Sequence, residues 1–336
     1  MSSTTHPERN EFLDITKGVL MLLVVWGHVI QVIAYGDGSY FEDPIFKAIY
    51  TFHMPLFMAI SGYVSYGSIQ RHAWLPMVTR RFNQLIVPAF VWAAIFGVIV
   101  SATAVMFQGA DIRHTWVHLP MLVFKTASSF WFLWAIFFFT VIIATLKTVR
   151  CDTVAFMTAV FFFYLLVPAL GKDYLFKFTL PFFCVGYIVA RAGVPALVMK
   201  SSAGIAAMVA SVVFYLLWNR QDYIYVSQMC LSLENLPHIV FRMACGIVIS
   251  FAVLRGLFTV FATPPLRIFS VIGKRSLEIY ILHTIVLKVV PAMAQPLDPV
   301  VFASTAAPML ALTFCLLCSI GNGFPFGKTL NFRMGH

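Results

Sequence analysis

The chain has few charged residues and no long polar segment. Only 11% of its 336 residues are charged and only 13 are acidic, whereas 60% are hydrophobic. The mean hydropathy is +0.88. A soluble domain cannot bury that much apolar surface, so the composition excludes a soluble globular protein and indicates several membrane spans. The apolar runs are continuous and do not alternate with polar residues, which excludes membrane-spanning strands.

Cysteine is also scarce. Of the six cysteines, Cys315 and Cys318 have the spacing of a metal or redox motif, but they lie in an apolar run without histidine neighbours. We therefore expect the cysteines to act as small apolar side chains. His114 and His118 are four residues apart, as in some metal sites, but no carboxylate completes a familiar zinc motif. We expect them to be surface residues and expect no metal.

Polar interruptions divide the sequence into ten expected membrane helices. A hydrocarbon core roughly 30 Å thick needs about 20 apolar residues per helix. The expected fold class is all-α: a polytopic transmembrane helical bundle of about ten spans, in one membrane domain over residues 1–336, with no separate soluble domain. Pro88, Pro168 and Pro181 are expected to end or kink helices. The expected spans are 12–33, 45–66, 84–107, 130–149, 153–170, 175–191, 199–218, 238–262, 269–290 and 299–320.

Basic residues are distributed unevenly between the two expected sides. If the N-terminus is cytoplasmic, thirteen basic residues fall inside and four outside. Cytoplasmic loops are enriched in Lys and Arg, so we expect both termini in the cytoplasm. The net charge of +10 then reflects topology and does not indicate nucleic-acid binding. The expected location is a plasma membrane, the inner membrane of a bacterium. The inner group is Arg71, Arg80, Arg81, Lys147, Arg150, Arg191, Lys200, Arg255, Arg267, Lys274, Arg275, Lys328 and Arg333; the outer group is Arg113, Lys125, Lys172 and Arg220.

The first expected span, LDITKGVLMLLVVWGHVI, carries an acid, a base and an imidazole. Eleven residues of α-helix make three turns plus roughly 20°, so Lys17 and His28 share a face about 16 Å apart along the axis. Asp14 falls within about 60° of Lys17. Asp14 and Lys17 could form an interfacial ion pair whose lysine extends to the headgroups. Ionisable groups inside spans are functional by default, so His28 is a candidate site residue.

Two other expected spans carry histidines at a similar depth. His53 lies in the second, where the nearby Pro55 removes one backbone hydrogen bond and frees a carbonyl. His283 lies in the ninth, with Glu278 and Tyr280. The three histidines could line one cavity. The alternative is three unrelated buried hydrogen bonds.

Arginines occur at both ends of the expected bundle. Arg80 and Arg81 lie at the cytoplasmic edge, where guanidinium forks suit phosphate groups. The alternative is that they only orient the chain. Arg242 lies inside the eighth span near its outer end, where it could pair with Glu234 or point into a cavity.

These motifs resemble the acyltransferase-3 family of integral-membrane O-acyltransferases. The family's first span typically carries an Asp, then Arg-Gly three residues on, and a His after ten further residues; here these are Asp14, Lys17-Gly18 and His28. The second span, FHMPLFMAISGY, resembles a form common in sugar O-acetylases of the fucose 4-O-acetylase-like branch. Lys17 keeps the charge of the usual arginine but lacks its bidentate fork. The resemblance therefore does not imply that Lys17 makes the precise phosphate or thioester contact that an arginine could make.

Later family motifs follow in the same order, and the resemblance extends from about residue 9 to residue 290. They correspond to Arg80, Arg81 and Pro88, to Trp131 in Trp-Phe-Leu, and to Ser276, Tyr280 and His283.

The resemblance implies transfer of an acetyl group from acetyl-CoA to a sugar hydroxyl of an envelope glycan or its lipid-linked precursor. The expected partners are acetyl-CoA, that acceptor and membrane lipids. A hydroxyl needs a base, and an imidazole with an ordinary pKa near 6.5 is suited to this. We assign His28 as the base, with His53 or His283 as orienting residue or second base. The other assignments are Asp14 and Lys17 to guide or balance the donor; Arg80, Arg81, Lys274, Arg275 and Ser61 to bind CoA; and Trp131, Arg242, Glu278 and Tyr280 to bind the acceptor.

Two other classes stay open at this point. In a transporter or channel, buried histidines and a lysine relay protons or bind the substrate. No inverted repeat of broken helices stands out, which weakens that alternative. A non-catalytic membrane scaffold leaves the polar residues of the first span unexplained.

The topology can be tested with reporter fusions at Gly38 and Gln70. These residues flank the second expected span, so the reporters should lie on opposite sides of the membrane. Reporters that both respond from the same side would overturn the predicted arrangement.

Overall fold

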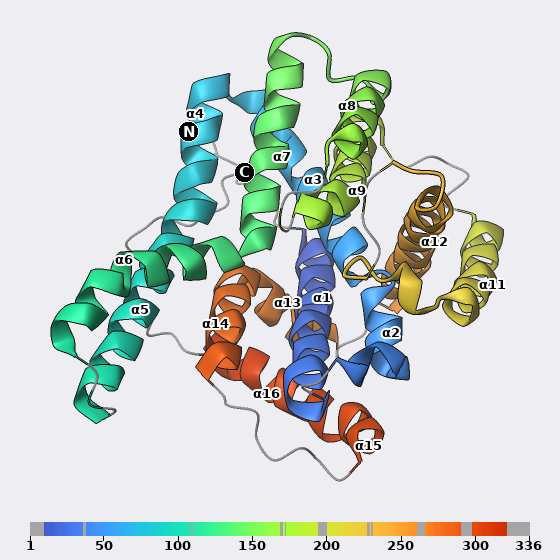
Figure 1. Cartoon of the computed structure of the whole chain (residues 1–336). Helices are drawn as coiled ribbons and strands as arrows, with labels where there is room; N and C mark the ends of the chain where they lie inside the picture. Colours follow the sequence, from blue (N-terminus) through green and yellow to red (C-terminus); the bar gives the residue numbers. More distant parts are fainter. Residues whose placement is uncertain are drawn as a thin grey trace, which may run out of the picture.

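The structure, a computed structural model, describes residues 10–35, 38–107, 109, 111–168, 171, 173–193, 200–226, 229, 231–260, 266–289 and 298–320. All regular elements in these residues are helical (Figure 1). The α-helices are α1 (Glu11–Val29), α2 (Pro44–Tyr50), α3 (His53–Arg71), α4 (Trp74–Arg81), α5 (Val87–Phe107), α6 (Ile112–Ser129), α7 (Trp131–Thr148), α8 (Val154–Leu166), α9 (Asp173–Ala192), α11 (Ser201–Leu217), α12 (Leu236–Val260), α13 (Arg267–Lys274), α14 (Ser276–Val289), α15 (Pro299–Ser304) and α16 (Ala306–Ile320). The short segments are η1 (Ile30–Tyr35), η2 (Ser39–Glu42), η3 (Phe82–Ile86) and η4 (Arg220–Asp222).

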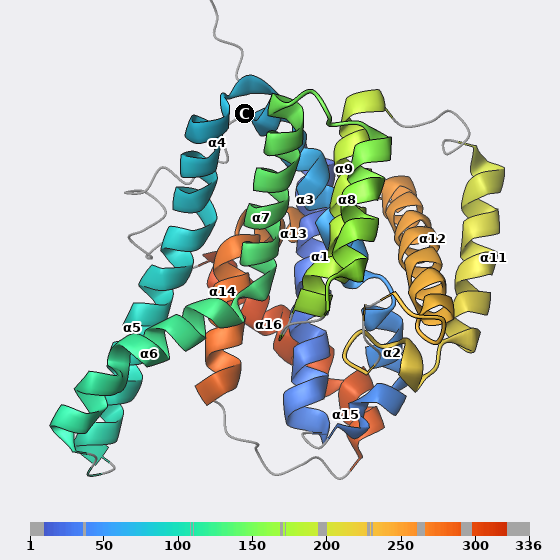
Figure 2. The same ribbon diagram turned by 45° about the horizontal axis from the view of Figure 1, so that its top comes forward.

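The prediction of an all-α, polytopic membrane bundle is confirmed. Within the described residues, six helical segments are long and apolar enough to cross a membrane, and three shorter apolar helices accompany them. Each of the ten expected spans corresponds to one or two of the observed helices. Figure 2 shows α7, α8, α9, α11 and α12 side by side, while the hairpin of α5 and α6 extends away from them.

Polar side chains determine where several helices begin. Asn10 precedes α1, and its side chain accepts a hydrogen bond from the N–H of Leu13 at 3.2 Å. Asp43 precedes α2 and accepts two N–H groups of its first turn. Asp111 accepts the N–H of His114 at 2.7 Å at the start of α6. Each cap satisfies backbone donors that the helix itself leaves unpaired.

Two expected spans are broken near a proline. The expected helix 45–66 ends at Tyr50 and restarts at His53, and the expected helix 299–320 breaks at Thr305. Pro55 and Pro308 are each the third residue of the helix that restarts. A proline ring clashes with the carbonyl four residues before it, so a continuous helix is disfavoured there. The sequence predicted a local opening at Pro55, and the structure shows a complete break.

The expected span 269–290 is also broken, at Arg275, between α13 and α14. No proline lies there. Gly273 weakens the helix locally, and its close contact with α1 fixes the direction of α13. Pro181, by contrast, lies inside α9 and does not end it.

No helix was expected between the spans 84–107 and 130–149, but this connection contains α6. This helix has an internal Pro120 and no continuous apolar run, so its composition resembled that of a loop. It folds back along α5, where Gly97 faces the side chains of Leu119 and Val123. His114 and His118 lie on it, exposed, with their Nε2 atoms 3.1 Å apart.

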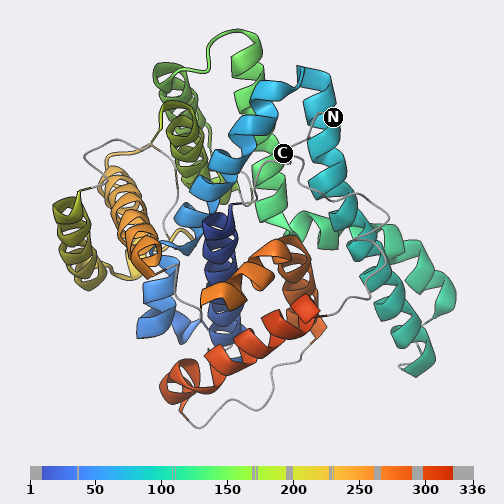
Figure 3. The same cartoon turned by 180° about the vertical axis from the view of Figure 1, so that it is seen from behind.

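Glycines allow two helix pairs to approach until their backbones touch. A Cβ at Gly18 of α1 would lie 1.9 Å from the carbonyl oxygen of Phe269, and one at Gly273 of α13 would lie 1.8 Å from that of Asp14. The same arrangement joins α3 to α9 through Gly62 and Gly186. Small residues permit this approach between membrane helices. Figure 3 shows α13, α14 and α16 grouped around α1.

We expect Gly273→Ala to destabilise the bundle, because the new Cβ would overlap a backbone carbonyl and not a movable side chain. The cost of such overpacking is about 2 kcal/mol, which should lower the melting temperature of the protein in detergent by several degrees. Gly256→Ala in α12 is the matched control, since no atom lies within 4 Å of its added Cβ. Equal melting temperatures for the two variants would contradict the close crossing of α1 and α13.

Candidate functional site

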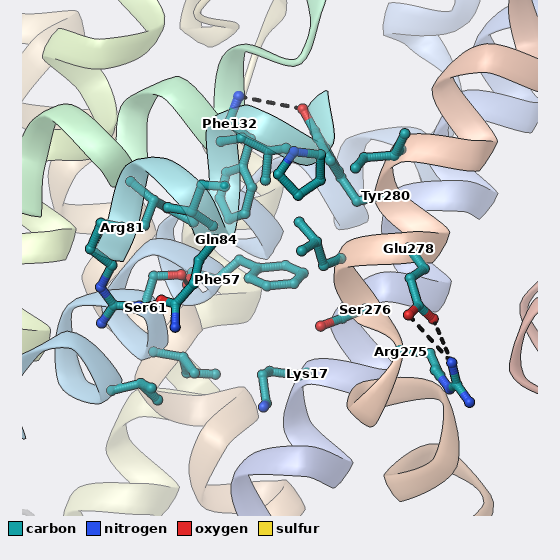
Figure 4. A pocket seen from close by; sticks show the side chains of 18 of the residues that line it. Lys17, Phe57, Ser61, Arg81, Gln84, Phe132, Arg275, Ser276, Glu278 and Tyr280 are labelled. Atoms are coloured by element: carbon teal, nitrogen blue, oxygen red, sulfur yellow. Dashed lines mark hydrogen bonds and ion pairs between the residues drawn. The ribbon is translucent and has the colours of Figure 1, made fainter. Parts of the chain in front are cut away.

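A cavity of about 190 Å³ lies where α1, α3, α4, α5, α7, α13 and α14 meet. Four basic side chains line it: Lys17, Arg81, Lys274 and Arg275. Figure 4 shows Lys17, Arg81 and Arg275 around one end of the cavity, with the rings of Phe57, Phe132 and Tyr280 toward the other end. The cavity therefore has a charged end and an aromatic end.

Two of the four cations have carboxylate partners. Lys17 Nζ lies 2.8 Å from Asp14, and both side chains are buried, with exposed fractions of 8% and 2% for the two residues. Arg275 lies 3.1 Å from Glu278. Within the part of the chain that the structure describes, no carboxylate lies within 4 Å of the Arg81 or Lys274 nitrogens. This end of the cavity thus has a surplus of positive charge, which favours an anionic ligand.

Arg81 is only 6% exposed, and its guanidinium has a weak set of partners. Nη2 donates to Ser65 Oγ at 3.3 Å, and Nη1 donates to Gln84 Oε1 at 3.4 Å. Its Nε is buried and makes no hydrogen bond to the described residues. An incompletely paired buried guanidinium is costly, so this cavity is suited to a ligand that supplies the missing acceptor.

The aromatic end is held by a few short contacts. The rings of Phe57 and Phe132 meet edge to face with centroids 5.0 Å apart. The N–H of Phe132 donates to the Tyr280 hydroxyl at 3.3 Å. Ser61 lines the cavity, and its hydroxyl donates to the Phe57 carbonyl at 2.8 Å.

The three histidines of the sequence analysis come together beside this aromatic end. The rings of His28 and His283 lie 5.3 Å apart. Tyr50 connects the other pair, with its hydroxyl 3.2 Å from His28 Nδ1 and its ring 4.6 Å from that of His53. We call His28, Tyr50, His53 and His283 the histidine cluster. None of its members lines the cavity, but Tyr280 does, and its ring lies 5.4 Å from that of His283.

The hydrogen bonds of the cluster constrain the protons of its imidazoles. His53 Nδ1 lies 2.8 Å from the Ile49 carbonyl, and His283 Nδ1 lies 3.1 Å from the Ile279 carbonyl. A carbonyl only accepts, so both Nδ1 atoms carry hydrogen, and Nε2 of each neutral ring has a lone pair. The Nε2 atom of His283 lies 3.4 Å from the Thr284 hydroxyl. His28 Nδ1 faces a hydroxyl, which can donate or accept. If Nδ1–H donates to Tyr50, His28 Nε2 is also able to take a proton.

The other candidate residues lie elsewhere. Arg80 points to His72, whose Nε2 is 3.2 Å from its Nη1. Arg242 lies on α12 and is 1% exposed, and the Asp222 carboxylate interacts with it electrostatically. Trp131 packs beside Phe132, with centroids 6.0 Å apart, and does not line the cavity. Within the described ranges, no group of three or more His, Cys, Asp or Glu side chains could hold a metal ion.

Three residues of the site were not predicted from the sequence: Tyr50, Ser65 and Gln84. Ser65 and Gln84 hold Arg81, and Tyr50 links two histidines. Two pairs have a spacing of three that could have suggested a contact, Tyr50 with His53 and Arg81 with Gln84. Ser65 lies on α3, 16 residues before Arg81, and nothing in its spacing marks it.

The chain is similar in sequence to known proteins over most of its length. The family profile described as an acyltransferase domain, acyltransferase-3, matches residues 10–320. The chain is 31% identical over 287 residues to the nodulation protein NolL of Mesorhizobium japonicum, covering 82% of this chain and 76% of that protein. It is 32% identical over 231 residues to the nodulation protein NolL of Sinorhizobium fredii, covering 65% and 60% respectively. No solved structure matches the chain.

Proposed function

This chain belongs to the acyltransferase-3 family and is a multi-pass membrane acyltransferase, and we propose that it moves an acetyl group from cytoplasmic acetyl-CoA to a sugar hydroxyl. The acceptor is a cell-envelope glycan or its lipid-linked precursor, and the membrane is the bacterial inner membrane. The main support for this proposal is that the basic cavity lies next to the histidine cluster. Tyr280 lines the cavity, and its ring contacts that of His283 in the cluster.

The cavity suits the donor because its ends differ in chemistry. A volume of about 190 Å³ is too small for a whole CoA molecule, so only the acyl end and its uncharged arm would enter. Lys274 is exposed at the mouth, where it can reach the phosphates. Arg81 and Lys17 lie deeper and can contact oxygen atoms of the arm or of the thioester. The acetyl group would then lie toward Tyr280.

The residue positions also support an orientation. The cavity is lined by Lys17 near the start of α1, by Arg81 at the end of α4, and by residues at the junction of α13 and α14. With both termini in the cytoplasm, this end of the bundle faces the CoA pool. The histidine cluster then lies nearer the outer face, since His28 is eleven residues further along α1.

The chemistry needs one proton to be moved. The acceptor hydroxyl gives its proton to Nε2 of His28 while its oxygen attacks the thioester carbonyl carbon. The carbon–sulfur bond then breaks, and the CoA sulfur leaves and takes the proton back from the imidazolium. Tyr50, as acceptor of Nδ1–H, would hold His28 in the tautomer that this step requires. His53 and His283 serve as orienting groups or as a second base, and the Lys17 cation, balanced by Asp14, faces the donor.

Not every expected contact fits equally well. Arg275 is already paired with Glu278, so Arg81 and Lys274 are the stronger CoA ligands. Arg80, Trp131 and Arg242 are outside the cavity lining. The proposed roles of Arg80 and Trp131 rest on the family resemblance alone, and that of Arg242 rests on its position inside an expected span.

Arg81→Ala should raise the KM for acetyl-CoA about tenfold, because a hydrogen bond from a charged donor contributes about 1.5–3 kcal/mol. The maximal rate should change little. Arg71→Ala is the matched control: Arg71 is an exposed arginine at the end of α3, bonded to the Gly67 carbonyl and outside the cavity. Equal KM values for the two variants would mean that Arg81 does not bind acetyl-CoA and only helps to orient the chain in the membrane.

His28→Ala should reduce acetyl transfer about 100-fold or more, the usual scale for loss of a general base. His28→Asn is the informative comparison, since Asn can still bond Tyr50 but cannot take the proton. It should be nearly as slow as the Ala variant in an assay with labelled acetyl-CoA. Near-normal transfer by His28→Asn would mean that His28 is not the general base and that His53 or His283 has this role.

A further inference from the structure

Aromatic rings that do not line the cavity lead from the histidine cluster to the surface. The ring of Tyr50 lies 6.2 Å from that of Tyr225, which lies 6.3 Å from that of Tyr174. Exposure rises along this path, from 2% at His53 to 9% at Tyr50 and 43% at Tyr225. We call Tyr50, Tyr174 and Tyr225 the outer tyrosines.

The segments that carry these rings are firmly held. Asp43 Oδ1 accepts two backbone N–H groups at the start of α2, at 2.9 and 2.8 Å. Phe46 stacks on Tyr50 with centroids 3.8 Å apart. Close to Tyr225 in sequence, Tyr223 is buried and its hydroxyl donates to the Phe41 carbonyl at 3.0 Å. The path is therefore preformed, as ligand sites usually are.

The outer tyrosines and the cavity contact different members of the histidine cluster. The cavity reaches His283 through Tyr280, whereas the outer tyrosines reach His28 and His53 through Tyr50. A donor in the cavity and an acceptor beside Tyr50 would thus both approach His28 without competing for one space. Figure 1 shows α2, which carries Tyr50, close to the segment between α11 and α12, which carries Tyr225.

We propose that the outer tyrosines bind the acceptor sugar, with the Tyr225 ring stacked on a sugar face and Tyr50 guiding one hydroxyl to His28. This inference rests on the proposed acetyl transfer to carbohydrate. Aromatic rings offer a large rigid apolar face together with a polar tip, which matches the C–H face and hydroxyl edge of a sugar ring.

The test compares Tyr225→Ala, which removes the ring, with Tyr225→Phe, which keeps it. Each variant is expressed in a strain whose own gene is deleted, and ester-linked acetyl on envelope glycans is measured by mass spectrometry. Tyr225→Ala should lower that acetyl content about tenfold, and Tyr225→Phe should keep at least half of it. Tyr63→Ala, which removes a 39% exposed tyrosine from α3, should leave it unchanged. Binding of labelled acetyl-CoA to the purified protein should be the same in all four proteins.

The outcomes separate this inference from the proposed function. Wild-type acetylation by Tyr225→Ala would overturn the acceptor site. Loss of acetyl-CoA binding together with acetylation would also overturn it, since Tyr225 would then only support the fold. A wild-type chain that neither binds acetyl-CoA nor restores glycan acetylation would instead refute the proposed function, and this inference with it.

Discussion

The close crossing of α1 and α13 determines the geometry on which the site depends. Each helix presents a glycine to a carbonyl of the other, Gly18 to Phe269 and Gly273 to Asp14. The second contact is made by the residue that also holds Lys17, so backbone packing and the buried ion pair are coupled at one point. This crossing brings Lys17 of α1 to the same cavity as Lys274. Any wider separation would move the two cations apart.

The ion pair explains how charged groups are accommodated in an apolar helix. Burying an unpaired charge is very costly, and Asp14 and Lys17 offset each other within one turn. Arg81 has no such carboxylate partner among the described residues and relies on Ser65 and Gln84. Stability alone would favour an apolar residue there. A buried cation with weak partners is better explained by a ligand that completes its contacts.

Features contained in a single helix could be predicted from the sequence. Asp14, Lys17 and His28 share a face because helical spacing requires it, and the apolar runs indicated the spans. Features that depend on which helices meet could not. Arg80 and Arg81 are adjacent and equally basic, yet only Arg81 faces the cavity while Arg80 bonds His72.

The break between α2 and α3, the helix α6 and the role of Tyr50 also depend on which helices meet, so the sequence did not predict them. Pro55 indicated a weak point, but only packing decided that α2 would end and α3 restart. The helix α6 was not predicted because contact with α5 stabilises it despite its mixed composition. Tyr50 resembles any apolar aromatic until α1 and α2 are placed together, and then it lies between His28 and His53.

The proposed mechanism requires the donor to enter the basic cavity from the cytoplasmic end of the bundle. The most direct measurement compares inside-out with right-side-out membrane vesicles that contain the protein, each given labelled acetyl-CoA on the outside. Acetyl-CoA does not cross the bilayer, so we expect labelled envelope glycan in inside-out vesicles only. Right-side-out vesicles should become labelled after they are permeabilised. Equal labelling of intact right-side-out vesicles would contradict it, because the donor would then reach the protein from the outer face.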